Sequence, residues 1–114
     1  MPSPTISTHV LDTALGRPAA GVPLVLSRQS AGAWIEAGKS VTDADGRCRT
    51  LLGERPAETG LYRLRFGIAP YFAAQGQTPL YPYVEIVFHV ADPTQHLHIP
   101  LLMTANGYTT YRGS

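Results

Sequence analysis

The sequence contains little cysteine and no long apolar run, and both absences narrow what the protein can be. Cys48 is the one cysteine among 114 residues, so it forms no internal disulfide and it fits a reducing compartment. The opening residues, MPSPTISTHV, lack the basic and apolar stretches of a secretion signal. No stretch reaches the ~18 consecutive apolar residues of a membrane span. We therefore expect no membrane partner and, in the absence of a targeting signal, a cytoplasmic location.

Charge is also scarce. Charged residues make up 15% of the chain, whereas soluble domains average about 25%. Nine Lys and Arg against eight Asp and Glu leave a net charge of +1, and the basic residues form no run. This balance argues against a nucleic-acid partner. Because a small protein has a large surface for its volume, so little charge predicts that another subunit covers part of that surface.

The length of the chain predicts one domain, residues 1–114, with a core of its own. Short segments alternate apolar and polar residues with a period of two, which is typical of half-buried strands. In LYRLRF, for example, Tyr62 and Leu64 share one face while Arg63 lies on the other. We predict about eight strands, at residues 5–12, 22–28, 33–38, 40–42, 47–52, 61–67, 83–90 and 96–112, the last a hairpin broken near Asn106-Gly107.

Helix signals are few. PYFAAQGQ could form about two turns, with Pro70 at the start and Gly76 near the end. Strands spaced every ~8–12 residues, with turn signals such as DADG at Asp43 to Gly46, indicate an antiparallel sandwich or barrel. Its core is expected to include the aromatic residues Trp34, Tyr62, Phe66 and Phe88.

Three histidines are the first candidates for chemistry, because imidazole titrates near neutral pH and can accept a proton, donate one or bind metal. His9 is expected on the outer face of its strand, and alternation puts His96 and His98 together on the outer face of theirs. The plain interpretation is three surface imidazoles. A zinc site with all three as ligands is conceivable, but the chain has no CxxC or HExxH motif to support it.

Arginine and the chain end supply further candidates. Arg47 and Arg49 follow the DADG turn on one face, where a guanidinium could clamp a planar anion or simply be solvated. The terminal GYTTYRGS is rich in β-branched and aromatic residues, so it is expected to be ordered and to offer an edge for a second subunit.

Several segments together resemble the 5-hydroxyisourate hydrolases, the transthyretin-related enzymes of urate breakdown. They cover about residues 5–114, and the terminal tetrapeptide is the most specific, because transthyretins, the hormone carriers of this fold, end differently and lack the histidines. The segments, in chain order, are STHVLDTALGRPAAGVPLVL, TDADGR, GLYRLRF, YFAAQGQTPLYPYVEIVFHV, HLHIPLL and YRGS.

The resemblance implies an all-β fold, a transthyretin-like β-sandwich of two four-stranded sheets with one short helix. It also implies a homotetramer, a dimer of dimers, with active sites in the channel between the dimers. Ala105-Asn106 departs from the family pattern, which usually has an aromatic residue there. The implied catalytic residues are His9, Arg47 and His98, and the implied substrate-binding residues are Tyr111, Arg112, Ser114 and His96.

The substrate that the resemblance implies is 5-hydroxyisourate, a planar oxidised purine that opens when water attacks a ring carbonyl. We expect His9 and His98 to act as general bases and Arg47 to stabilise the developing oxyanion, with no cofactor or metal. Three rivals remain open: a non-catalytic carrier of small aromatic ligands, a zinc hydrolase that uses the three histidines, and a purely structural sandwich domain.

Overall fold

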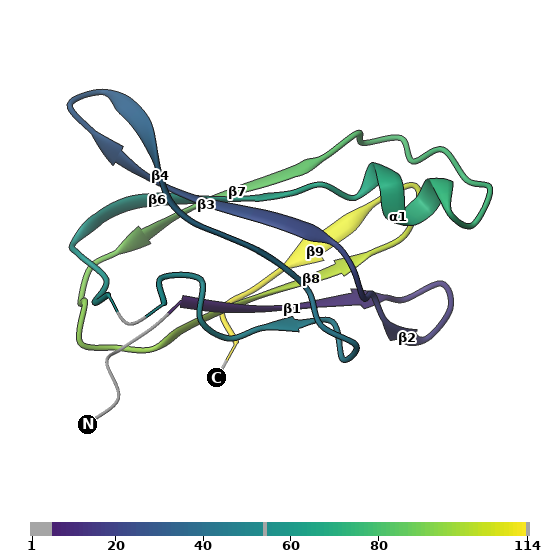
Figure 1. Cartoon of the computed structure of the whole chain (residues 1–114), viewed down its shortest axis with the longest axis horizontal. Coiled ribbons are helices and arrows are strands. Elements are labelled where there is room, and N and C mark those ends of the chain that lie inside the picture. Colours follow the sequence, from purple (N-terminus) through teal and green to yellow (C-terminus); the bar gives the residue numbers. More distant parts are fainter. Residues whose placement is uncertain (1–5, 54, 114) are drawn as a thin grey trace.

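Two β-sheets lie face to face in the computed structural model, which describes residues 6–53 and 55–113 (Figure 1). β1, β8 and β9 belong to one layer, and β3, β4, β6 and β7 form the other. The elements are β1 (Ile6–Asp12), β2 (Arg17–Pro18), β3 (Pro23–Ser30), β4 (Ala33–Val41), β5 (Arg47–Cys48), β6 (Gly60–Phe66), α1 (Ala69–Ala73), β7 (Val84–Val90), β8 (Leu97–Met103) and β9 (Tyr108–Thr110).

The first sheet is built around β1 and β8. β9 lies beside β8, while β2 and β5 share the other edge of β1: β5 faces Thr8 and β2 faces Leu11. Within the described residues this sheet therefore has five strands, one more than predicted, because β2 and β5 are two short strands that pair with different parts of the same edge. β1 and β8 run parallel, whereas the other strand pairs of both sheets are antiparallel. The expectation of antiparallel pairing throughout is wrong for this pair, because the chain passes through the whole second sheet between these two strands.

The second sheet has the strand order β4, β3, β6, β7. The strands predicted at 33–38 and 40–42 are one continuous strand, β4. A β-bulge interrupts its pairing: Leu26 faces Gly38 and Ser27 faces Glu36, so Ala37 is the extra residue. Glycine is needed beside this bulge, because a Cβ on Gly38 would lie 1.8 Å from the carbonyl oxygen of Leu51.

The strand predicted at 47–52 is shorter in the structure, where β5 covers only Arg47–Cys48. The chain then turns, and the backbone N–H of Gly53 donates to the carbonyl oxygen of Thr50 at 2.9 Å. Leu51 and Leu52 are both buried. The turn, rather than a continued strand, carries both side chains into the core.

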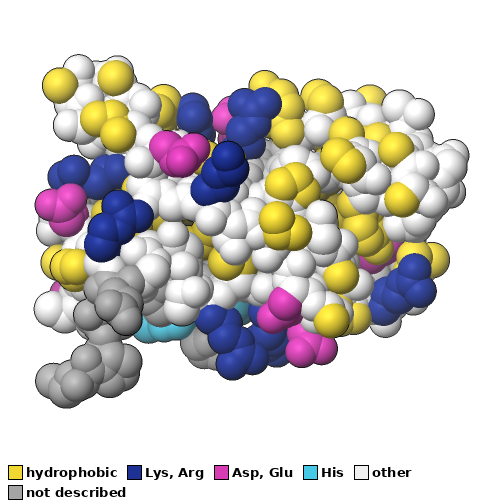
Figure 2. All heavy atoms as spheres, viewed as in Figure 1, with side chains coloured by type: hydrophobic (Ala, Val, Ile, Leu, Met, Phe, Trp, Pro, Cys, Tyr) yellow, Lys and Arg dark blue, Asp and Glu magenta, His cyan; other side chains and the backbone are white. Residues whose placement is uncertain are grey.

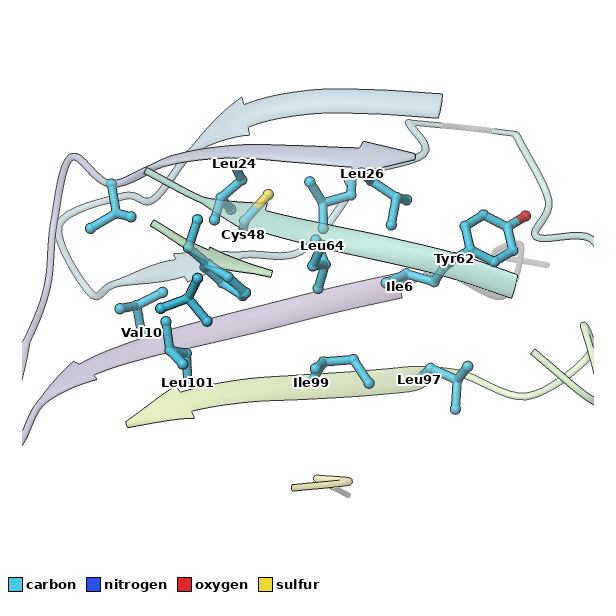
Figure 3. Close-up of a cluster of buried hydrophobic side chains, with 14 of the residues drawn as sticks. Ile6, Val10, Leu24, Leu26, Cys48, Tyr62, Leu64, Leu97, Ile99 and Leu101 are labelled. Carbon is cyan, nitrogen blue, oxygen red and sulfur yellow. The ribbon is translucent and has the colours of Figure 1, made fainter. Parts of the chain in front are cut away.

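The core fills the space between the two sheets (Figure 3). Tyr62 and Phe66 are fully buried, as predicted, and Phe88 is half-buried against them. Trp34 is not a core residue. It is half-buried on the outer face of the second sheet, with the guanidinium carbon of Arg63 4.8 Å from the centre of its ring. A cation–π contact of this kind can stabilise an aromatic ring outside the core, which periodicity did not reveal.

The short helix lies at one end of the sandwich (Figure 1). α1 carries Pro70 in its first turn, and Gly76, with a φ of 73°, follows its end, as predicted. Phe72 is the buried residue that anchors this helix to the core. No helix among the described residues is long and apolar enough to cross a membrane.

Candidate functional site

The parallel pairing of β1 with β8 positions the histidines. In this register Ser7 lies opposite His98, and His9 lies opposite Pro100. On the other side of β1, Arg47 in β5 lies opposite His9. Since these side chains alternate with buried ones, they share the outer face of the first sheet. The structure therefore brings His9, Arg47 and His98 together, on the face that alternation predicted.

Ser7 contacts two histidines at once. The residue is 5% exposed, and its Oγ lies 2.8 Å from Nε2 of His96 and 2.8 Å from Nδ1 of His98. A hydroxyl has one hydrogen to donate, so at least one ring must donate its N–H to Ser7. Ser7 could not be recognised as a site residue from the sequence, because a serine in a strand has no chemical signature. Only its register with His98 reveals it.

The DADG turn positions Arg47 and His9. Oδ1 of Asp43 accepts the backbone N–H groups of Asp45 and Arg47, each at 2.9 Å. Both hydrogen bonds lower the pKa of the Asp43 carboxyl below its usual value, and the bond from Arg47 has the larger effect. The carbonyl oxygen of Asp45 lies 2.8 Å from Nε2 of His9. Because a carbonyl only accepts, His9 donates from Nε2, and the neutral ring carries its lone pair on Nδ1.

A pocket of about 420 Å³ opens beside these groups. Figure 2 shows histidine at the lower edge of the molecule next to basic side chains. Burial lowers the pKa of His98 below its usual 6.5, and the nearby His96, His9 and Arg47 lower it further. His98 is therefore a neutral imidazole at pH 7, the form that a general base requires. The pocket is lined by Ser7, Thr8, Arg47, Arg49, Thr50, His96 and His98.

The end of the chain lies against His98. The backbone N–H of Gly113 donates to the carbonyl oxygen of His98 at 2.8 Å. A Cβ on Gly113 would lie 2.5 Å from Cδ2 of the His98 ring, so only glycine allows this approach. Arg112 donates from Nη2 to Oε1 of Gln95 at 2.7 Å, which fixes the terminal segment.

Tyr111 and Arg112 are not brought into the histidine pocket. They line a second, more apolar pocket of about 240 Å³ between β7, β8 and the end of the chain. Tyr111 is 56% exposed. Ser114, the remaining predicted substrate contact, lies outside the described residues.

No three His, Cys, Asp or Glu side chains in the described part of the chain are arranged to share a metal ion. His9, His96 and His98 therefore do not form the three-ligand set that a zinc hydrolase would need. Cys48 is 7% exposed and belongs to the core, where it is a small apolar side chain.

The two sheets, their strand order and the short helix define a transthyretin-like β-sandwich. Residues 6–113 match the HIUase/Transthyretin family, and the chain belongs to this family. A 5-hydroxyisourate hydrolase from Mus musculus is 47% identical over 114 residues, which cover 98% of this chain and 97% of that protein. A 5-hydroxyisourate hydrolase from Caulobacter vibrioides is 44% identical over 113 residues, or 96% and 97% of the two chains.

Solved structures of this fold include both a 5-hydroxyisourate hydrolase and a transthyretin. The 5-hydroxyisourate hydrolase of Klebsiella pneumoniae superposes with a TM-score of 0.85 at 34% identity, over 97% of this chain and 99% of that one. Transthyretin from Sparus aurata superposes with a TM-score of 0.89 at 33% identity, over 95% of each chain. Because the fold fits both, the side chains of the site must decide between the two functions.

Proposed function

We propose that this protein hydrolyses 5-hydroxyisourate, opening its ring to 2-oxo-4-hydroxy-4-carboxy-5-ureidoimidazoline. The observation that carries the proposal is the pocket that His98 and Arg47 line together with hydroxyl side chains. A carrier of aromatic ligands needs mostly apolar walls, whereas this pocket presents imidazoles, guanidinium groups and hydroxyls. The names of the curated relatives support the same substrate.

His98 is the proposed general base. Its Nδ1 contacts Ser7, and Nε2 has no hydrogen-bond partner among the residues that the structure describes. A water molecule at Nε2 would lose a proton to His98 as its oxygen attacks the ring carbonyl. The protonated ring would then return that proton to the nitrogen that leaves as the C–N bond breaks. A base with a lowered pKa is available for this cycle throughout the neutral pH range.

Arg47 and His9 complete the proposed catalytic group. The Arg47 guanidinium would donate hydrogen bonds to the carbonyl oxygen as negative charge develops there. No carboxylate in the described part of the chain forms an ion pair with Arg47, so its charge is available to the substrate. His9, fixed by the Asp45 carbonyl, would orient the water through Nδ1. No cofactor takes part in this scheme.

Tyr111, Arg112, Ser114 and His96 stay predicted substrate-binding residues. The bond of Arg112 to Gln95 favours a role in fixing the terminal segment rather than direct contact with the substrate. Tyr111 lies away from the histidine pocket of its own chain. Its proposed contact with the substrate therefore depends on assembly with further subunits.

We further propose a homotetramer, a dimer of dimers, of this one-domain chain in the cytoplasm. The low charge of the chain supports assembly, and so do large exposed apolar side chains such as Leu80, 67% exposed, and Tyr111. β7 and β9 are the outer strands of their sheets, with open edges among the described residues. Sedimentation as a monomer at micromolar concentration would overturn this assembly.

The activity is tested by generating 5-hydroxyisourate from urate with urate oxidase and following its decay by absorbance. We expect the protein to accelerate the decay well beyond the rate in buffer. A carrier would instead bind an aromatic ligand without turnover, and decay at the buffer rate would reject the enzyme. Activity that survives exhaustive chelation would separately exclude the zinc hydrolase.

A further inference from the structure

The DADG turn, between β4 and β5, contacts β1 at two points. The backbone N–H of Val10 donates to the carbonyl oxygen of Gly46 at 2.7 Å, and Nε2 of His9 donates to the carbonyl oxygen of Asp45 at 2.8 Å. A Cβ on Gly46 would lie 2.4 Å from the carbonyl oxygen of Val10, so the close approach of the turn to β1 requires glycine. The turn therefore holds a proposed catalytic residue directly, and its shape determines where the Asp45 carbonyl points.

One side chain fixes the inside of this turn. Oδ1 of Asp43 accepts the backbone N–H groups of Asp45 and Arg47, each at 2.9 Å. The backbone N–H of Asp43 also donates to the carbonyl oxygen of Arg47 at 3.0 Å. A single oxygen atom thus orients two peptide groups. One belongs to the residue whose carbonyl holds His9, and the other to the residue whose guanidinium lines the pocket.

We propose that Asp43 is a positioning residue for the hydrolysis. Its Oδ1 aims the Asp45 carbonyl at His9 and fixes the backbone from which the Arg47 side chain reaches the pocket. The proposal rests on the proposed function, in which His9 and Arg47 act on the water and the oxyanion. Asp43 is exposed and is not among the described residues that line the pocket. It therefore acts through these two residues, by limiting their movement relative to the substrate.

An effect of Asp43 on the rate could come from its shape or from its charge. The positive charges of Arg49 and Arg47 both contribute to the low pKa of its carboxyl, so its negative charge also acts on these guanidinium groups. The two explanations are separable, because the amide oxygen of asparagine can accept the same two hydrogen bonds without a charge. Asp43→Asn keeps the acceptor and removes the charge, whereas Asp43→Ala removes both.

The kinetic test compares these two variants with the wild type and with Asp92→Ala. Asp92 is a matched control, because it is exposed and its Oδ1 accepts the backbone N–H of Thr94 at 2.9 Å in the loop between β7 and β8. We expect kcat to fall about tenfold in Asp43→Ala with KM changed less than about twofold, since alignment in the transition state is lost. Asp43→Asn and Asp92→Ala should keep kcat within about twofold of the wild type.

Three kinetic results would overturn the proposal. If Asp43→Ala keeps the wild-type kcat, the turn needs no side chain to align the site. If Asp43→Asn loses as much activity as Asp43→Ala, the charge matters rather than the hydrogen bonds. If Asp92→Ala also falls about tenfold, the loss reflects general loosening of turns.

The contact itself is measured without substrate, by NMR of amide hydrogen exchange in the assembled protein. We expect the amides of Asp45 and Arg47 to be protected in the wild type and in Asp43→Asn, and to exchange about tenfold faster in Asp43→Ala. Equal exchange in the wild type and Asp43→Ala overturns the positioning role, whether or not the protein hydrolyses 5-hydroxyisourate. If exchange is as expected and the wild type does not accelerate the decay of 5-hydroxyisourate, the proposed function fails instead.

Discussion

The outer faces of the two sheets both carry arginine side chains, but these arginines have different surroundings. On the second sheet, Arg63 and Arg65 both contact Glu85, at 3.4 and 3.5 Å, and Arg65 stacks 3.8 Å from the centre of the Tyr83 ring. On the first sheet, Arg47 lies among histidines, and within the described residues no carboxylate oxygen is close enough to form an ion pair with it. One face neutralises its arginines, whereas the other keeps a positive charge facing a pocket.

The difference between the two faces is tested most directly by replacing one polar side chain on each. We expect His98→Asn to lower kcat by roughly 10²- to 10⁴-fold, because asparagine cannot accept the water proton. Lys39→Gln, an exposed residue of β4 in the second sheet, should change kcat less than about twofold. Both are measured by the decay of enzymatically generated 5-hydroxyisourate. Full activity in His98→Asn would show that the base is another group.

Replacing one arginine on each face with glutamine gives a second, matched pair of variants. Arg47→Gln should reduce kcat/KM by about 10²- to 10³-fold, since it removes a donor to the developing oxyanion. Arg63→Gln removes a guanidinium of the same length from the other face and should leave kcat/KM nearly unchanged. The measurement is the kcat/KM of each variant from steady-state kinetics. Equal losses in both would mean that long-range charge, rather than local contact, supports catalysis.

Two glycines near the chain end test the close approach of the terminal segment to His98. Gly113→Ala would place a Cβ 2.5 Å from Cδ2 of His98 and displace the ring. Displacement of a reacting group by about 1 Å costs on the order of 10²-fold in rate. Gly107→Ala meets nothing within 4 Å and serves as the control. A Gly113→Ala enzyme with wild-type kcat and an unchanged melting temperature would contradict the contact.

Acid should affect the first face before the second. The lowered pKa of His98 keeps the ring neutral below pH 6.5, so kcat/KM is expected to be flat near pH 7 and to fall about tenfold per pH unit below that pKa. Because the unfolded chain binds this proton more readily than the folded chain, stability also decreases as pH falls through the same window. A kcat/KM midpoint above 6.5 in a pH profile would contradict this assignment.

The smallest effect is expected on the second face. Glu85→Gln removes the carboxylate that Arg63 and Arg65 share, but these side chains are partly exposed. The free energy of unfolding should fall by no more than about 1 kcal/mol, because solvent screens such pairs. Denaturant unfolding measures this change, and kcat should be unaltered. A larger loss would show that the outer arginines hold the sheet together.

Local patterns predicted most of this architecture. The alternation around Tyr62 and Leu64 identified β6 and its buried face, and the same rule put His9 and His98 on the outer face of their strands. Pro70 marked the start of the helix. Such features depend on neighbours within a few residues, so one sequence is enough to find them.

Features that depend on distant partners escaped prediction. Ser7 acquires a role only from its register with His98, and the direction of that pairing is not encoded in either strand alone. Trp34 has the large aromatic side chain that is typical of a core residue, yet Arg63 from another strand holds it on the outer face. The chain after β5 brings the carbonyl oxygen of Leu51 close to Gly38 of β4, a contact that the residues around Leu51 do not indicate by themselves.

The parallel pairing of β1 with β8 also affects the order in which parts of the protein fold. Ser7 and His98 are separated by 91 positions along the chain, so their contact closes a very long loop and is among the slowest to form. Trp34 lies in the hairpin of β3 and β4, which needs only local closure. During refolding, the fluorescence of Trp34 should therefore recover before enzymatic activity, which makes catalysis itself a reporter of the last strand to dock.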